Sequence, residues 1–286
     1  MKRRRFLQIA AAASLVGTRT QASTWQGRAF GADVSIQVPG PAPMAEVLAE
    51  IAAIEACFSL YRDSEVTRLN ATGRAPGSAH LRAALKVAQQ VHQATQGAFD
   101  PTVQSLWTAL AEAGDVPKAR TKIGLEHVEI GPEITLGYGQ SLTFNGIAQG
   151  YAADRVAQIL ARHGVGDCLI DMGEYCALDG QFRLGIEDPD AGLVGRCTLD
   201  GRGGQRALAT SSPGALALPG GSHILGPRGQ RPVWSTVTVE AESAALADAA
   251  STAFVLLEKA ALKQAARSLR TGPVTVVDFE GNLQVI

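Results

Sequence analysis

Two oxygen-bearing side chains near the C-terminus have the spacing of a metal site. Asp248 and Thr252 lie four residues apart in an alanine-rich run, residues 247–253. Positions i and i+4 share one face of a helix, so a carboxylate and a hydroxyl would lie side by side. Such oxygen ligands suit a hard cation. The pair would equally suit the solvated edge of an alanine-rich helix, and spacing alone leaves both interpretations open.

A glycine-containing segment, residues 145–155, offers a complementary feature. Gly146 and Gly150 follow a β-like run at residues 141–144 and open a helical pattern. A strand that leads into a helix N-terminus presents backbone N–H groups to an anion. With the oxygen pair, the segment predicts a site that holds a phosphate and a hard metal ion together.

The elements that must position these residues follow from the period of the apolar residues. Helical spacing recurs in four segments, and Gly97 and Gly164 supply stop signals for two of them. The expected helices are residues 43–60, 81–95, 147–164 and 243–269.

Short strands dominate the second half of the chain, where glycine and proline separate β-like runs. Residues 280–282 suit the turn of a final hairpin. The region 111–137 resembles connecting structure with one short strand at 127–130. Helices and strands do not alternate regularly, so the fold class expected is α+β with mixed short-strand sheets and packed helices. The expected strands are residues 34–38, 168–172, 182–186, 196–199, 207–211, 235–239, 274–279 and 283–286.

Composition bounds the class of protein. The chain has 286 residues, and 46% of them are hydrophobic, which supports a sizeable core. A formal net charge of −1 argues against a nucleic-acid partner. No apolar run reaches the roughly 18 residues that a stable membrane anchor needs.

The N-terminus has the pattern of an export signal. Lys2 to Arg5 precede an apolar run at residues 9–16, and small residues follow near Ala22. We interpret residues 1–22 as a twin-arginine signal peptide and residues 23–286 as one domain, or two intimate halves. A basic amphipathic tail is the alternative. No cysteine precedes Cys57, so we expect an exported periplasmic protein without a lipid anchor.

The four cysteines carry no metal or redox motif. Cys57, Cys168, Cys176 and Cys197 form no C-x-x-C pair. An oxidising compartment would permit a bridge from Cys176 to Cys168 or to Cys197, and buried thiols fit the sequence equally well.

Several motifs occur in the order found in one family. The chain resembles the ApbE family of FAD:protein FMN transferases from about Gly27 to its C-terminus, so the resemblance implies an ApbE-like, T-fold-related architecture. Its most specific motif is G-A-F-D-P-T-V at residues 97–103, followed by L-W. The other matching motifs lie at residues 30–32, 58–61, 63–70, 145–155, 171–174, 223–227 and 247–253.

The resemblance implies a reaction and a site. FMN passes from FAD to a threonine hydroxyl of a partner flavoprotein, AMP is released, and Mg²⁺ neutralises the phosphates. Asp248, Thr252 and a backbone oxygen at Gly146 are the implied metal ligands, and His223 and Asp248 the implied catalytic residues. The implied cofactor-binding residues are Phe30, Tyr61, Ala98, Phe99, Asp100, Thr143, Gln149, Glu174 and His223.

Each of these residues also has a structural interpretation. His223 could only hydrogen-bond a loop, and Asp100 suits a helix N-cap before Pro101. Phe30 and Tyr61, as single aromatic residues, could belong to the core. Glu174 could cap a turn.

The glycine segment departs from the family pattern. The family's D-x-G-G-I-A-K-G is here T-F-N-G-I-A-Q-G, so an acid is replaced by Thr143 and a lysine by Gln149. The pair of changes fits loss of a mutually compensating ion pair, or weakened cofactor binding. This version and the leader resemble the NosX-like subfamily that serves nitrous oxide reductase maturation, whose acceptor is a NosR-type membrane flavoprotein. The alternatives are an FAD pyrophosphatase and a non-catalytic periplasmic FAD-binding protein.

Overall fold

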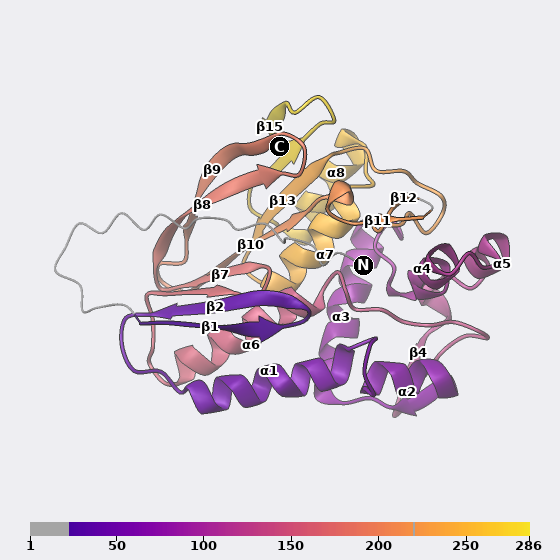
Figure 1. The fold of residues 1–286 in the computed structure, drawn as a ribbon, viewed down its shortest axis with the longest axis horizontal. Helices are drawn as coiled ribbons and strands as arrows, with labels where there is room; N and C mark the ends of the chain where they lie inside the picture. The colour runs from indigo at the N-terminus through magenta and orange to yellow at the C-terminus, as the bar shows by residue number, and fades with distance from the viewer. Residues whose placement is uncertain (1–22, 220) are drawn as a thin grey trace.

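One antiparallel sheet of eight strands forms the centre of the molecule, a computed structural model that describes residues 23–219 and 221–286 (Figure 1). The expected α+β class is confirmed. In spatial order the strands are β1 (Ser23–Ala29), β2 (Ala32–Val38), β6 (Cys168–Asp171), β7 (Tyr175–Leu178), β10 (Gln205–Ser211), β13 (Thr236–Ala241), β14 (Val274–Val277) and β15 (Leu283–Val285).

Smaller antiparallel units surround the central sheet. A long hairpin joins β8 (Gln181–Asp188) to β9 (Gly192–Asp200), and a short one joins β11 (Ala217–Leu218) to β12 (Gly221–Ser222). A three-stranded sheet contains β3 (Arg74–Pro76), β5 (Glu133–Thr135) and β4 (Glu129–Ile130).

Helices cover the sheet and one another. Figure 1 shows α6 and α7 beside the central strands, with α1 farther out and α4 and α5 at the edge of the molecule. α7 packs on β10 and β13, whereas α6 packs on β6, β7, α1 and α7. The helices are α1 (Met44–Phe58), α2 (Glu65–Thr72), α3 (Ala79–Ala94), α4 (Gln104–Ala111), α5 (Val116–Arg120), α6 (Ala148–Arg162), α7 (Ala244–Phe254) and α8 (Lys259–Leu269).

The late helix expected over residues 243–269 is wrong as a single element. It is two helices, α7 and α8, separated by residues 255–258. Val233 N–H donates to the Val255 carbonyl at 2.8 Å, and the Trp234 indole donates to the Leu257 carbonyl at 2.9 Å. The carbonyl groups of Val255 and Leu257, which would accept hydrogen bonds within an uninterrupted helix, therefore accept them from a distant segment.

Other elements match the sequence more closely. The expected helices over residues 43–60, 81–95 and 147–164 correspond to α1, α3 and α6 within a few residues. The expected strand at 127–130 is shortened to β4 because residues 125–127 form a 3₁₀ turn. Nine elements were not expected: the helices α2, α4 and α5 and the strands β1, β3, β5, β7, β11 and β12. The β-like run at residues 141–144 forms no strand.

Further predictions concern the export signal, membrane spans and the cysteines. The predicted export signal, residues 1–22, lies outside the described residues. In the part of the chain that the structure describes, no helix combines the length and apolarity needed to cross a membrane. All four cysteines are free thiols; Cys57, Cys168 and Cys176 are buried, and desolvation raises the pKa of each.

Candidate functional site

The candidate site is built where α6 crosses α7. Gly150, in the first turn of α6, approaches α7 so closely that a Cβ atom there would overlap the Ala244 carbonyl group. Its backbone N–H donates to Oδ2 of Asp248 at 3.1 Å. Glycine at this position therefore allows both the helix crossing and a hydrogen bond to the implied metal ligand.

Asp154 fastens the start of α7 to α6. Its carboxylate accepts hydrogen bonds from Ala244 N at 2.7 Å, Ala245 N at 3.0 Å and the Ser243 hydroxyl at 2.7 Å. These amides belong to the first turn of α7, where the backbone donors have no partner within the helix. Asp154 thereby fixes the position of Asp248, one turn further along the same helix.

Asp248 and Glu174 form a pair of buried carboxylates. Glu174, after β6, accepts a hydrogen bond from Thr210 N at 3.0 Å. Burial, and next the charge of Asp248, raises the pKa of Glu174 well above its ordinary value. Burial likewise raises the pKa of Asp248. Within residues 23–219 and 221–286 neither carboxylate has a lysine or arginine ion-pair partner, so the pair favours a cation from solution.

The other implied metal ligands converge on the same place. A Cβ atom on Gly146 would lie 2.9 Å from Oγ1 of Thr252, so the backbone before α6 comes directly against the Thr252 side chain. Asp248 and Thr252 share the face of α7 that the i, i+4 spacing predicted, and both line one cavity with Gly146.

The cavity gathers every implied site residue except one. Phe30 does not line it; the residue sits with φ 53° at the turn between β1 and β2, where its N–H donates to Glu55 and its side chain packs on the core. The core interpretation accounts for these contacts, and a contact between Phe30 and the flavin stays a prediction. The implied residues that do line the cavity are Tyr61, Ala98, Phe99, Asp100, Thr143, Gly146, Gln149, Glu174, His223, Asp248 and Thr252.

His223 follows the β11–β12 hairpin and makes the loop hydrogen bond that one of its two interpretations predicted. Its Nδ1 donates to the Leu216 carbonyl at 3.0 Å, and its backbone N–H donates to the same oxygen at 3.2 Å. Because a carbonyl can only accept, Nδ1 carries the proton, and in neutral imidazole Nε2 then carries the lone pair. The loop contact thus selects the tautomer in which Nε2 can act as a base.

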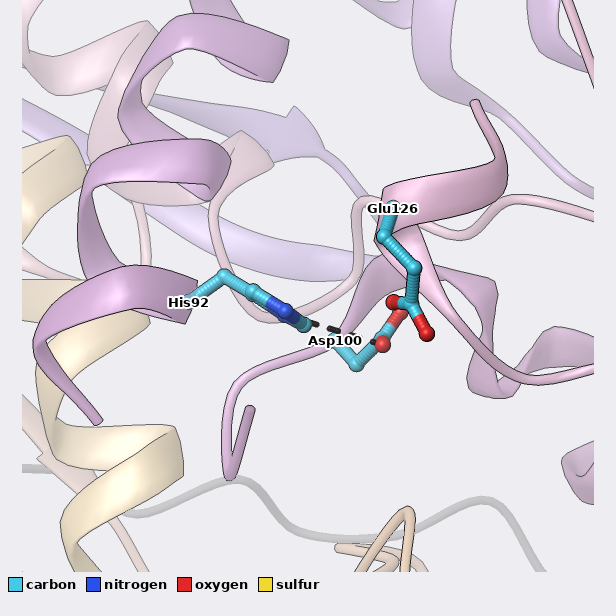
Figure 2. Close-up of side chains that lie close together, drawn as sticks. All are labelled: His92, Asp100 and Glu126. Carbon is cyan, nitrogen blue, oxygen red and sulfur yellow. Dashed lines mark ion pairs between the residues drawn. The ribbon is translucent and has the colours of Figure 1, made fainter. Parts of the chain in front are cut away.

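Both carboxylate oxygens of Asp100 accept hydrogen bonds from backbone amides. Its Oδ1 caps the 3₁₀ turn Pro101–Val103 by accepting from Thr102 N at 2.9 Å, and its Oδ2 accepts from Leu125 N at 3.1 Å. Figure 2 shows His92 directed toward Asp100, with Glu126 beside them. Nδ1 of His92 lies 3.6 Å from Oδ2 of Asp100. These three groups lie within 4.8 Å of one another and could hold a cation. Asp100 is nevertheless already bound by backbone donors, so its capping role suffices to explain its position.

Several cavity residues were not assigned from the sequence. Trp107 belongs to a motif that was recognised, but nothing in the sequence gave its side chain a role. Ser211 is the last residue of β10 and Ser212 follows it, and a pair of serines at the end of a strand carries no distinctive signal. No lysine or arginine is among the described residues that line the cavity, whereas Asp100, Glu174 and Asp248 all line it. A bound phosphate there would meet carboxylates and no fixed positive side chain.

A pair of buried carboxyl groups beside a histidine of defined tautomer is typical of an enzyme active site. The aromatic residues Tyr61, Phe99 and Trp107, which line the same cavity, suit a planar ring system. The family model of the ApbE family matches residues 30–276. The chain belongs to the ApbE family, and it is a flavin transferase that uses FAD.

Relatives agree with this assignment. The FAD:protein FMN transferase of Klebsiella pneumoniae (strain 342) is 23% identical over 291 residues, which span 90% of this chain and 82% of that protein. The apo Pseudomonas stutzeri flavinyl transferase ApbE is 27% identical with a TM-score of 0.78, covering 93% of this chain and 94% of its own. The Vibrio cholerae flavin transferase ApbE has a TM-score of 0.77 at 23% identity, covering 93% and 97%.

Proposed function

We propose that the chain transfers FMN from FAD to a threonine hydroxyl of a partner flavoprotein in a Mg²⁺-dependent reaction. The observation that carries the proposal is the buried pair Asp248 and Glu174, which lacks a lysine or arginine partner among the described residues and shares its cavity with His223. The acceptor oxygen forms a bond to the phosphorus next to riboflavin, the bond to the bridging oxygen breaks, and AMP leaves.

The donor set fits Mg²⁺. Asp248, Thr252 and the backbone oxygen of Gly146 are the oxygen ligands that Mg²⁺ prefers, and they meet in one cavity with an uncompensated carboxylate pair. Bound there, Mg²⁺ would neutralise phosphate charge as FMN transfers. This contribution matters because the described cavity wall offers the pyrophosphate no lysine or arginine.

The protein residues divide the remaining work. Nε2 of His223 accepts the proton of the acceptor hydroxyl, since the Leu216 carbonyl holds Nδ1 in its protonated form. Tyr61, Phe99 and Trp107 supply aromatic surface for the flavin. Tyr61 is 81% exposed, so a planar ligand lying against it would exclude water from that side.

The cellular setting belongs to the same proposal. The twin-arginine pattern in residues 1–22 supports export to the periplasm, and the N-G-I-A-Q-G-Y segment supports a NosX-like role in nitrous oxide reductase maturation. The acceptor would then be a NosR-type membrane flavoprotein with a target threonine.

A transfer assay tests the proposal. Residues 23–286 are incubated with FAD, Mg²⁺ and an acceptor domain that carries the target threonine, and the intact mass of the acceptor is measured. A mass gain of one FMN, absent with Asp248→Ala, is the expected result. FMN and AMP formed without an acceptor adduct would indicate FAD hydrolysis instead, and intact bound FAD without AMP would indicate a binding protein.

A further inference from the structure

The hydroxyl groups of Thr252, Ser211 and Ser251 form a row of hydrogen bonds. The donor in each of these hydrogen bonds can be deduced from the contact that Ser251 makes at the end of the row. Ser251 Oγ donates to the Asp248 backbone carbonyl at 3.0 Å. A carbonyl can only accept, so the single hydroxyl proton of Ser251 is used there. Ser211 must therefore be the donor in its 2.8 Å contact with Ser251.

The same reasoning identifies the donor in the hydrogen bond between Thr252 and Ser211. The proton of Ser211 is committed to Ser251, so Ser211 can only accept in its 3.3 Å contact with Oγ1 of Thr252. Thr252 is then the donor in that contact. Its oxygen can act only as an acceptor or ligand toward anything else in the cavity that it lines.

A second row of the same kind ends at the same cavity. Thr236 Oγ1 donates to Oδ2 of Asp188 at 2.7 Å, and Ser235 donates to the same oxygen at 2.6 Å. Burial opposes ionisation of Asp188, but these hydrogen bonds outweigh it and lower the pKa of the carboxyl. An ionised carboxylate only accepts, so Ser212 is the donor in its 2.8 Å contact with Thr236. Ser212, which also lines the cavity, thereby offers lone pairs alone.

Both rows give the cavity wall one polarity. The hydroxyls of Thr252, Ser211 and Ser212 have their protons committed within the protein, and each leaves oxygen lone pairs for a ligand. Beside Asp248 and Glu174, these three hydroxyls favour a hard cation over an anion, because their oxygens can coordinate and none of them can donate to a ligand.

We propose that Ser211 is a positioning residue that orients Thr252 as a metal ligand, and that Ser251 anchors this orientation. The inference rests on the proposed function, because it needs the metal site at Asp248 and Thr252. Without Ser211 the Thr252 hydroxyl loses its acceptor and can rotate its proton toward the cation position. Groups that orient a ligand in this way change metal affinity by about 10-fold or more when removed.

The test measures Mn²⁺ binding to the complete protein without FAD, from the electron paramagnetic resonance signal of free Mn²⁺. Ser211→Ala should weaken binding about 10-fold. Ser211→Thr, which keeps a hydroxyl, should restore most of it. Thr238→Val is the matched control, because Thr238 forms a hydroxyl pair with Thr210 in the same sheet but does not line the cavity. Its Mn²⁺ affinity should equal that of the wild type.

A double-mutant cycle decides whether Ser211 acts through Thr252. The Ser211→Ala/Thr252→Val protein should bind Mn²⁺ no more weakly than Thr252→Val alone. Additive losses, or wild-type affinity in Ser211→Ala, would overturn the inference. If Ser211→Ala does not fold, Ser251→Ala poses the same question from the anchored end, and unchanged affinity there would also overturn it. Equal affinity in wild type and Asp248→Ala would instead reject the metal site, and the inference with it.

Discussion

The amide of Gly150 donates to the carboxylate of Asp248 across 3.1 Å, and this contact joins the start of α6 to the face of α7 that carries Asp248 and Thr252. A second contact lies one turn further along α6, where Asp154 binds the first amides of α7. These hydrogen bonds hold α6 against α7, so the spacing of the oxygen groups between the two helices is set by the protein itself. Because the site is ordered before a ligand binds, less of the binding free energy of the substrate is needed to order these groups.

We expect Asp248→Asn to separate stability from activity. The amide keeps the size of the side chain and an acceptor for Gly150, but it removes a buried ionisable group whose charge raises the pKa of Glu174. FMN transfer should fall about 100-fold or more, because a metal ligand is lost. The metal-free protein should become more stable by about 1 kcal/mol. Acceptor mass and the midpoint of thermal unfolding measure the two effects.

Mg²⁺ provides the control for this prediction. It should raise the melting temperature of the wild type and leave that of Asp248→Asn unchanged, since ligand binding to the native state stabilises it. Asp200→Asn, which removes an exposed carboxylate paired locally with Arg202, should behave as the wild type in both assays. A variant that transfers FMN normally would contradict the role given to Asp248.

Stability of the metal-free protein should fall as pH rises. The folded state holds the protons of Glu174 and Asp248 more tightly than the unfolded chain, because burial raises both pKa values. The free energy of unfolding therefore decreases from the ordinary carboxyl range, about pH 4, up to the raised values. Mg²⁺ replaces protons at this pair, so its stabilising effect should increase over the same interval. Thermal unfolding at several pH values, with and without Mg²⁺, checks both trends; a Mg²⁺ effect independent of pH would contradict the assignment.

Gly150→Ala should destabilise the protein although alanine is the better helix former. In an exposed helix the change would gain about 1 kcal/mol. Here the new methyl group would overlap the Ala244 carbonyl group and push α6 away from α7, at a cost of about 1–3 kcal/mol. Gly40→Ala is the control, because a Cβ atom there meets nothing within 4 Å. Urea unfolding compares the two variants, and an unchanged midpoint for Gly150→Ala would show that the helices can separate without loss.

Local patterns predicted the oxygen pair and the glycine segment, the family resemblance implied the other site residues, and contacts between distant segments explain what both missed. The i, i+4 pair on α7 and the glycines of α6 are visible because a helix repeats over a few residues. The tie from Asp154 to Ala244 spans 90 positions, and the contact from Ser211 to Ser251 spans 40. No period connects such residues, so Ser211 and Ser212 were not assigned.

Fold class followed from the same local signals, whereas several short elements and the break in the late helix did not. Helical spacing continues past Phe254, which is why a single late helix was expected. The break at residues 255–258 depends on Val233 and Trp234, whose donors bind two of the carbonyls there. Phe30 differs from the other implied residues for a related reason: its motif position suggested the flavin, whereas its tertiary contacts place it in a turn against the core, outside the cavity.

His223→Ala should abolish transfer while FAD still binds. The imidazole is positioned by the Leu216 carbonyl with Nε2 as the base, so its removal affects proton transfer more than binding. A decrease of about 100- to 10,000-fold in the rate constant is expected. FAD affinity, measured by quenching of flavin fluorescence, should be unchanged. His163→Ala is the control, since His163 pairs with Glu46 on the surface. Equal losses of affinity and rate would indicate that His223 binds FAD instead.

Gln149→Lys should strengthen FAD binding in the absence of metal. Gln149, in the first turn of α6, lines a cavity whose described wall contains Asp100, Glu174 and Asp248 but no lysine or arginine. A lysine here would give the pyrophosphate a direct positive partner, and one charged hydrogen bond corresponds to about 10-fold in affinity. Flavin fluorescence quenching in the presence of a chelator measures the change.

The charge, rather than the length, of the new side chain is what matters in this experiment. Gln149→Met keeps an unbranched side chain of similar length without charge and should bind FAD no better than the wild type. Adding Thr143→Asp to Gln149→Lys should return the affinity toward that of the wild type, because the carboxylate competes with the pyrophosphate for the lysine. If Gln149→Lys and Gln149→Met bind FAD equally, position 149 does not face the phosphates, and the loss of the family's acid and lysine has left cofactor binding unaltered.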